Sequence, residues 1–437
     1  MVLLSHSVRI FESACKGCVN CLKSCPTEAI RVVDGSIRIL KDLCIDCGEC
    51  LRTCGKKALG LEEDDWDIIK SHTPGILAVD PTFFAQFGAY WHPSMVIQCL
   101  REWGLDMIVD QAPRAFDLAA YAVAKSIEMA SREQLPLIST YCPSVVRLIQ
   151  VRFPELIGRL VTVQNPLDIM GDLWRMETGR RDPITLLAPC PSKITLVRCP
   201  VSRSSSPFQH VVSVRKVTRQ LLAAGPQVAD NLPDPTNKRW LKWALRGGEA
   251  RHVRAFSSKP IVTLAVSGLR NTLDLLQDLE LGRLSGVDFV ECRVCDLGCI
   301  GGIANAESRF LASLRLQPLS APWDISPEER EEIAALYDRG TWALEMPVQP
   351  RPRLPLSQDL TEAMAKLKEM KAIYAQLPHI DCGSCGRPSC NAMAEDIVRG
   401  EGEITDCIFK LRDEISDLAG RIAALSKSVP HTMKGRS

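Results

Sequence analysis

The sequence has almost no net charge and no long apolar run. Its 53 lysines and arginines face 52 aspartates and glutamates, a net charge of +1, so no global charge attracts nucleic acid or an anionic membrane. No segment reaches the roughly 18 consecutive apolar residues that a membrane-spanning helix needs. The first residues also turn polar too early for a secretory signal. These absences predict a cytoplasmic protein with no membrane span and no nucleic-acid partner.

Cysteine, by contrast, is abundant, with 19 copies in the chain. In a chain without an export signal the thiols are kept reduced, so this number indicates metal binding rather than disulfides. Most of the cysteines fall into three groups, one at each end of the chain and one in the middle.

The first group consists of two runs with the spacing C-x2-C-x2-C-x3-C. Three thiolates of such a run bind one [4Fe-4S] cubane, and the fourth binds the other cubane. Cluster one is therefore assigned to Cys15, Cys18, Cys21 and Cys54, and cluster two to Cys44, Cys47, Cys50 and Cys25. The runs resemble the bacterial two-[4Fe-4S] ferredoxins and predict a ferredoxin domain over residues 1–62. Zinc is disfavoured, because zinc sites usually combine two separated cysteine pairs.

The second group lies near the C-terminus, with the spacing C-x2-C-x4-C-x16-C. Its members are Cys382, Cys385, Cys390 and Cys407. The spacing resembles a small [4Fe-4S] module of membrane electron-transfer subunits and corrinoid iron–sulfur proteins, and predicts a domain over residues 376–410. A single four-cysteine site is less specific than a doubled one, so zinc stays open as an alternative. A linker and a helix, residues 346–375, precede this domain.

Between these groups, over residues 65–345, short apolar runs alternate with amphipathic helical segments. Runs such as GILAVD, DMIVD, LPLIST, ITLLAP, IVTLAVSG and VDFVE are typical of strands buried on both faces. The alternation predicts an α/β layer with parallel strands, in which ligands bind beyond the carboxyl ends of the strands. Cys142, Cys190 and the run CRVCDLGC follow such strand ends. They predict a cubane site on four thiols, although one buried cysteine after a strand is usually only a small apolar residue.

These central segments resemble the cluster-binding region of [FeFe]-hydrogenases. The motifs are STYCP with Cys142, APCPSK with Cys190 and Lys193, and ECRVCDLGCIGG with Glu291, Cys295 and Cys299. The resemblance implies a cubane on Cys142, Cys190, Cys295 and Cys299. It also implies that Cys299 bridges to a two-iron unit bearing CO, CN and a dithiolate (the H-cluster), and that Lys193 bonds a cyanide nitrogen. These implied roles make Cys299 and Lys193 the candidate catalytic residues, and Lys193 and Glu291 the candidate cofactor-binding residues.

The chain departs from the catalytic members of that family along their proton route. Tyr141 stands where they have a proton-transferring thiol, and a phenol with a pKa near 10 suits that transfer poorly. Gln111 and Arg114 stand in place of carboxylates, and Ala188 and Arg293 in place of methionines beside the two-iron unit. The pattern is similar to the sensory or regulatory members, without the PAS domain that often follows in them.

After Cys407, apolar residues recur in steps of 3, 4, 3, 4 and 3. They are Ile408, Leu411, Ile415, Leu418, Ile422 and Leu425. This heptad seam predicts a C-terminal helix over residues 408–430 that forms a coiled coil, either as a homodimer or with a redox or signalling partner. The alternative is an ordinary helix that packs on its own domain, and Gly420 weakens the seam.

Taken together, the expected fold is α+β and multi-domain. It has an N-terminal two-cluster ferredoxin fold, a central α/β hydrogenase-like domain with parallel strands, and a small C-terminal Fe-S domain followed by a helix. The expected function is hydrogen or redox sensing in an anaerobe, by a multi-cluster protein of the [FeFe]-hydrogenase family with low hydrogenase activity. The expected cofactors are four [4Fe-4S] clusters, with or without the two-iron unit. The alternative is an electron-transfer or Fe-S assembly protein whose central cysteines hold only a plain [4Fe-4S] cluster.

Overall fold

The computed structural model describes residues 6–71, 74–88, 90–226, 239–320, 322–351 and 355–427. The chain divides into two compact units. Unit 1 comprises Met1–Arg9, Cys44–Arg52 and Gly60–Arg351, and unit 2 comprises Ile10–Leu43, Thr53–Leu59 and Pro352–Ser437. The ferredoxin region expected at residues 1–62 therefore contributes to both units, and most of it shares unit 2 with the C-terminal cysteine region.

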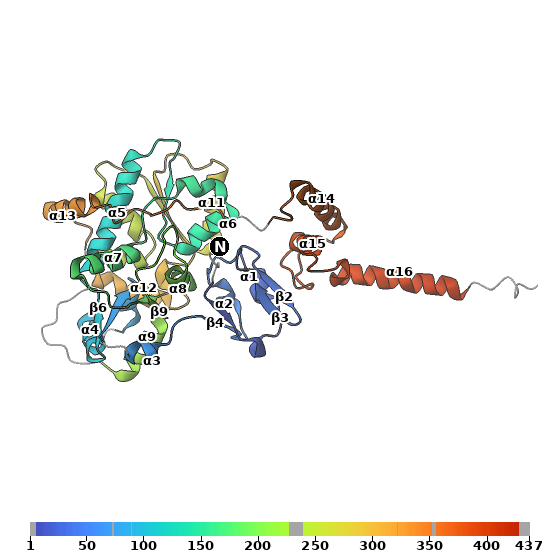
Figure 1. Cartoon of the computed structure of the whole chain (residues 1–437), viewed down its shortest axis with the longest axis horizontal. Coiled ribbons are helices and arrows are strands. Elements are labelled where there is room, and N and C mark those ends of the chain that lie inside the picture. Colours follow the sequence, from blue (N-terminus) through green and yellow to red (C-terminus); the bar gives the residue numbers. More distant parts are fainter. Residues whose placement is uncertain are drawn as a thin grey trace, which may run out of the picture. The chain divides into compact units, whose positions relative to one another are not determined.

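Unit 1 contains two parallel sheets (Figure 1). The first has four strands in the order β6 (Leu105–Met107), β5 (Gly75–Val79), β8 (Ile184–Ala188), β9 (His210–Ser213). The second has three, in the order β10 (Thr263–Ser267), β11 (Phe289–Arg293), β7 (Leu137–Ile138). Every pairing in both sheets is parallel, which confirms the α/β prediction for this region.

Two details of the sheets differ from expectation. β10 is only half-buried, not buried on both faces, because it is an edge strand of the smaller sheet. β9 was not predicted, since its four residues run directly into the helix Val214–Ala224 and the helical period hides them.

The helices of unit 1 follow the strands and cover the sheets. They are α3 (Trp66–Ser71), α4 (Pro93–Glu102), α5 (Gln111–Met129), α6 (Pro143–Arg152), α7 (Pro166–Thr178), α8 (Pro191–Arg198), α9 (Val214–Ala224), α10 (Gly248–Phe256), α11 (Leu269–Glu280), α12 (Arg309–Leu319) and α13 (Pro327–Tyr337). Helix α5 packs against α7, α10 and α13. Its alanine-rich buried face allows these close approaches, and it forms part of the main apolar core.

Two of these helices begin with a cysteine followed by a proline. Cys142 is the N-cap of α6 and Cys190 is the N-cap of α8, and the next residue in each case is a proline at the first helical position. Proline suits that position because its φ angle is helical and its missing N–H has no partner to lose there. Each thiol is thereby fixed in the turn between a strand end and a helix start.

Unit 2 contains the antiparallel hairpin of β2 (Ile30–Val33) and β3 (Ser36–Ile39), with the short helix α1 (Asn20–Ser24) before it. Helices α14 (Leu360–Gln376), α15 (Cys390–Val398) and α16 (Ile408–Ser426) also belong to it. The short elements β1 (Val8–Ile10), α2 (Glu49–Thr53) and β4 (Leu59–Leu61) complete the ferredoxin region, and β1 pairs with β4.

Within the described residues, no helix combines the length and apolarity that a membrane crossing requires.

Helix α16 exposes its whole heptad seam. The six seam residues are between 41% and 71% exposed, and no residue of the helix is buried. The described part of the helix therefore does not pack its seam on its own domain, as the ordinary-helix alternative required. Residues 428–430 of the predicted helix lie outside the described residues.

We predict that this seam pairs with a second copy of α16. Isoleucine at the first and leucine at the fourth heptad position favour two parallel strands. Changing Ile415 and Leu418 to glutamate should turn dimers into monomers in sedimentation velocity, because a charge at these positions cannot be buried without a partner.

A matched control places glutamates at Ser416 and Ala423, on the outer side of the same helix, and should leave the dimer intact. A wild type that sediments as a monomer at every concentration would contradict the prediction.

Candidate metal centre

The central cysteines come from both sheets and meet in one cavity. Cys142 follows β7, Cys190 follows β8, and Cys295 and Cys299 follow β11. All four thiols line this cavity, together with Lys193, Arg293 and Cys47. The structure thus brings together the four residues that the motifs singled out.

Glycines allow the turn that carries Cys299 to approach its neighbours. Gly298 has a φ of +103°, and a Cβ there would lie 2.5 Å from the carbonyl oxygen of Ala244. A Cβ at Gly302 would lie 2.3 Å from the carbonyl oxygen of Pro189, the residue before Cys190. Any larger residue would push the turn away from Cys190, so these glycines hold the thiols together.

Burial makes the free thiols hard to ionise. It raises the pKa of Cys295 to about 11 and that of Cys299 to about 12, and it raises the pKa of Cys190 well above its ordinary value. The neighbouring thiols Cys142, Cys295 and Cys299 contribute further increases by repulsion between thiolates. Iron would offset this cost, because a coordinated thiol is deprotonated by the charge of the metal. The donor set therefore fits a [4Fe-4S] cubane.

The second ferredoxin run lies against this central site. Cys44, Cys47 and Cys50 belong to unit 1, and Cys47 lines the central cavity. Arg52, two residues after Cys50, approaches the sulfur of Cys295 to 3.8 Å and donates to the carbonyl of Gly301.

A buried carboxylate holds this run in place. Asp46 accepts a hydrogen bond from the amide of Ser7 at 3.0 Å and forms a 2.8 Å ion pair with Arg147 of α6. Burial raises the pKa of Asp46, although Arg147 favours its ionised form. The pair ties the cysteine run to the helix that begins at Cys142.

The four thiols assigned to cluster one lie together in unit 2. Burial raises the pKa of Cys21 to about 11, and Cys54, Cys18 and Cys15 add to the increase as neighbouring thiolates. The fourth cysteine of each run, Cys54 here and Cys25 in the other run, makes the same contact. The amide of Ala58 donates to the sulfur of Cys54 at 3.3 Å, and the amide of Ala29 donates to the sulfur of Cys25 at 3.2 Å.

The C-terminal cysteines also form one group in unit 2. Cys390 and Cys407 are buried with Leu377, Met393 and Ala394 in a small apolar cluster, against which Cys385 packs. A hydrogen bond from Ser384 lowers the pKa of the exposed Cys382.

No three cysteine, histidine or carboxylate side chains in the described residues are placed to hold one metal ion directly. A cubane, in contrast, binds each thiolate through a different iron atom.

Beside Cys299, four buried side chains form a compact group that we call the Tyr141 cluster: Tyr141, Lys193, Asp80 and Arg293. The ammonium of Lys193 lies 2.5 Å from Asp80 Oδ2 and 3.9 Å from the centre of the Tyr141 ring. The guanidinium carbon of Arg293 lies 4.4 Å from the centre of the same ring. The ring thus lies in contact with two cations, and it is only 1% exposed. Burial raises the pKa of Tyr141 well above its ordinary value, which further disfavours loss of its proton.

The carboxylates around Arg293 also have hydrogen-bond or ion-pair partners. Arg293 forms a 2.6 Å ion pair with Glu249 and lies 3.7 Å from Glu291. Glu291 accepts hydrogen bonds from the amides of Gly247 and Ala250, each at 2.9 Å. Its place in the third motif is therefore explained by capping the start of α10.

A two-iron unit would have to lie against this group of charged side chains. By the hydrogenase resemblance, Tyr141, Lys193 and Arg293 should surround that unit, with Cys299 bridging to it. In the structure these three side chains contact one another through the Tyr141 ring. Lys193 and Arg293 thus both contact the Tyr141 ring and line the cavity that holds the four thiols.

The residues expected on the proton route lie at the start of α5. Gln111 and Arg114 donate to Glu177 at 2.9 and 2.6 Å, and Arg114 also pairs with Glu332 at 2.7 Å. They form a surface cluster that joins α5 to α7 and α13. Sequence reasoning missed Asp80, the partner of Lys193, although Asp80 ends the run GILAVD and so lies at the carboxyl end of a predicted strand.

Three family models match the chain. They are described as "4Fe-4S dicluster domain" over residues 7–55, "Iron only hydrogenase large subunit, C-terminal domain" over residues 74–225, and "Putative Fe-S cluster" over residues 377–409. They confirm the expected order of a dicluster region, a hydrogenase-like region and a C-terminal Fe-S region. The chain is thus an iron–sulfur protein related to the [FeFe]-hydrogenases.

Solved structures of [FeFe]-hydrogenases show a distant similarity. A variant of HydA1 from Chlamydomonas reinhardtii is 14% identical, covers 65% of this chain and 96% of its own, and has a TM-score of 0.49. An apo HydA1 variant from the same organism is 13% identical, with coverage of 65% and 96% and a TM-score of 0.48. The structure of HydA(deltaEFG) is 13% identical, with coverage of 66% and 97% and a TM-score of 0.48. No curated protein matches the chain.

We predict that replacing Cys382 and Cys385 with serine removes about four iron atoms from anaerobically reconstituted protein and leaves the iron of the two ferredoxin clusters in place. A serine hydroxyl binds a cubane iron more weakly than a thiolate does, and here two of four ligands change. Iron analysis and electron paramagnetic resonance measure the result. The control is Cys99→Ala, which changes a buried cysteine of α4 and should retain all iron. Unchanged iron in the double variant would rule out a cluster on the C-terminal cysteines.

Proposed function

We propose that this protein is a multi-cluster electron-transfer protein whose central cysteines hold a plain [4Fe-4S] cluster. In this proposal the central site stores and passes electrons and does not convert hydrogen. The observation that carries the proposal is the Tyr141 cluster, whose Lys193 and Arg293 line the cavity beside Cys299.

The energetics of Lys193 support the proposal. One of the three donors of its ammonium is directed at Asp80, which is 2.5 Å away and fully buried, so the side chain cannot move far without weakening this pair. Removing one partner from a buried ion pair typically costs about 3–5 kcal/mol, because the other charge stays buried and unpaired. In this chain Lys193 is thus a structural counter-ion.

Arg293 adds a second obstacle. Its side chain is 1% exposed and replaces a flexible apolar methionine of the family with a cation that Glu249 and Glu291 fix in place. Moving Arg293 aside would separate it from both carboxylates. Together with the bulk of Tyr141, this network keeps the cavity suited to the cubane alone.

The contact between the second ferredoxin run and the central cysteines supports electron transfer. Cys47 lines the same cavity as the four central thiols, and Arg52 lies near the sulfur of Cys295. Cluster two, when bound, would therefore lie next to the central cubane. An electron can pass between them without proton transfer, so the lost proton route has no consequence for this function.

Hydrogen sensing is the second candidate. It is favoured by the retention of Cys299 and Lys193 at their motif positions, and it requires the two-iron unit. Regulation of a partner by redox state requires only the cubanes and is compatible with the first proposal.

Infrared spectroscopy distinguishes a central site with a plain cubane from one that senses hydrogen with a two-iron unit. Protein produced together with the hydrogenase assembly factors should show no bands of iron-bound CO or CN and about four irons at the central site. Bands in the wild type that disappear in Cys299→Ala would overturn the proposal and favour hydrogen sensing. A catalytic [FeFe]-hydrogenase matured in the same cells is the positive control. The variant carrying Tyr141→Cys and Arg293→Met tests whether smaller or uncharged side chains beside the cavity allow the unit to bind.

A further inference from the structure

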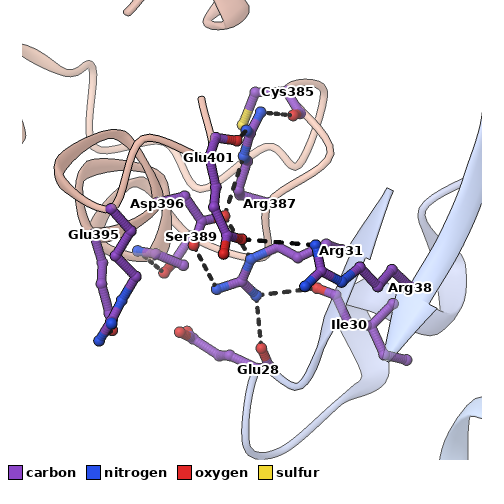
Figure 2. A network of polar contacts seen from close by, with 12 residues as sticks. Glu28, Ile30, Arg31, Arg38, Cys385, Arg387, Ser389, Glu395, Asp396 and Glu401 are labelled. Atoms are coloured by element: carbon purple, nitrogen blue, oxygen red, sulfur yellow. Dashed lines mark hydrogen bonds and ion pairs between the residues drawn. The ribbon is translucent and has the colours of Figure 1, made fainter. Parts of the chain in front are cut away.

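A buried charge network joins the ferredoxin hairpin to the C-terminal cysteine region inside unit 2 (Figure 2). Asp396 of α15 accepts two hydrogen bonds from Arg31 of β2, from Nε at 2.6 Å and from Nη2 at 3.1 Å. Arg387, in the cysteine loop, donates from its Nε to the same carboxylate at 3.2 Å. Asp396, Arg31 and Arg387 are 4%, 6% and 9% exposed. One carboxylate thus holds two guanidinium groups that lie far apart in the sequence.

Arg387 also stabilises the cysteine loop itself. It donates to the carbonyl of Cys385 at 2.9 Å and to the carbonyl of Glu401 at 2.6 Å, and it pairs with Asp406 at 2.8 Å. Asp406 directly precedes the ligand Cys407. The network that attaches the module to the hairpin therefore also shapes its cluster loop.

The backbones of the two regions are in direct contact. The amide of Val32 donates to the carbonyl of Gly386 at 2.8 Å. Gly386 has a φ of +77°, and a Cβ there would lie 2.2 Å from the carbonyl oxygen of Val32. Only glycine allows this approach, so the loop between Cys385 and Cys390 is fitted to the edge of the hairpin.

Lys23 lies where the two cluster loops meet. It follows Cys21 by two residues, and its ammonium donates to the carbonyls of Asp381 and Pro388, the latter at 3.1 Å. A Cβ at Gly383 would lie 3.3 Å from Cδ of Lys23. The Lys23 side chain is thus held against the loop that begins with Cys382, while its backbone belongs to the helix that carries Cys21.

We propose that cluster one, on Cys15, Cys18, Cys21 and Cys54, and the C-terminal cluster form a fixed electron-transfer pair, with Lys23 between them and Asp396 as the clamp. The inference rests on the proposed function in that both sites hold [4Fe-4S] clusters. One electron leaves a reduced [4Fe-4S]⁺ cluster, which becomes [4Fe-4S]²⁺, and enters the other cluster, which changes from [4Fe-4S]²⁺ to [4Fe-4S]⁺. No bond forms or breaks and no proton moves.

The charge of Lys23 gives this position a function. A cation stabilises the more negative, reduced state of any cluster near it. Lying beside both loops, Lys23 should raise the reduction potentials of both clusters together, which keeps them matched for electron exchange. The C-terminal module would then be the point at which electrons enter or leave the ferredoxin region.

Electron paramagnetic resonance of fully reduced, reconstituted protein tests the pairing. The wild type should show spin–spin broadening between the two cluster signals. Cys382→Ser with Cys385→Ser should remove the part of this broadening that comes from the C-terminal cluster and leave only the coupling between cluster one and cluster two. Identical broadening in the fully loaded wild type and in this variant would overturn the proposal.

Asp396→Asn tests the clamp, because it removes the charge of the carboxylate that Arg31 and Arg387 share. We expect loss of the broadening, with faster hydrogen exchange in both β2 and α15. The matched control is Glu395→Gln, the neighbouring residue, whose carboxylate pairs with Arg399 of the same region at 2.8 Å. Broadening that persists in Asp396→Asn with unchanged exchange would contradict the role of the clamp.

If Asp396→Asn fails to bind its clusters, Lys23→Gln provides an independent test of the proposed pair. It should shift both midpoint potentials to more negative values while the broadening remains. Lys56→Gln, an exposed position near Cys54, should leave the C-terminal potential unchanged. A Lys23 variant that shifts neither potential would contradict the proposed position of Lys23. These measurements concern unit 2 alone, so a two-iron unit at the central site would overturn the proposed function without altering their outcome.

Discussion

The buried ion pair between Lys193 and Asp80 organises the side chains beside the central cysteines. Both side chains are at most 1% exposed, and neither charge can be left without its partner at low cost. The pair places the Lys193 ammonium against the Tyr141 ring, and Arg293 approaches the same ring. Lys193 and Arg293 therefore line the same cavity as the four thiols. In the proposed function, the cysteines provide the ligands for a cubane and these charged side chains disfavour a larger cluster.

Buried carboxylates paired with arginines also occur beside two other cysteine loops. Asp46 binds Arg147 and the amide of Ser7, which ties the second ferredoxin run to α6 and so to Cys142. Asp396 binds two arginines and joins the C-terminal loop to the ferredoxin hairpin. Each of these carboxylates joins a cysteine loop to another element of its own unit.

Much of this could be predicted from local sequence. Cysteine spacing identified the ferredoxin and C-terminal groups, and the alternation of apolar runs with helical periods predicted a parallel α/β region whose strand ends carry Cys142 and Cys190. Strand β9 was not predicted because it is short and continuous with a helix. The ion pairs could not be predicted because their partners are distant in the sequence. Arg31 and Asp396 are 365 residues apart, and nothing in their local sequence marks them as partners. Asp80 could have been found, since the strand-end rule that identified Cys190 applies equally to it.

The most direct test of the account is the iron distribution in the cluster-loaded protein, measured by anomalous diffraction at the iron edge from crystals grown without oxygen after exposure to the hydrogenase assembly factors. The account predicts cubane-sized anomalous density at the four cysteine sets, an intact contact between Lys193 and Asp80, and no iron between Cys299 and the Tyr141 ring. Two additional irons bridged to Cys299, with Lys193 released from Asp80, would contradict it.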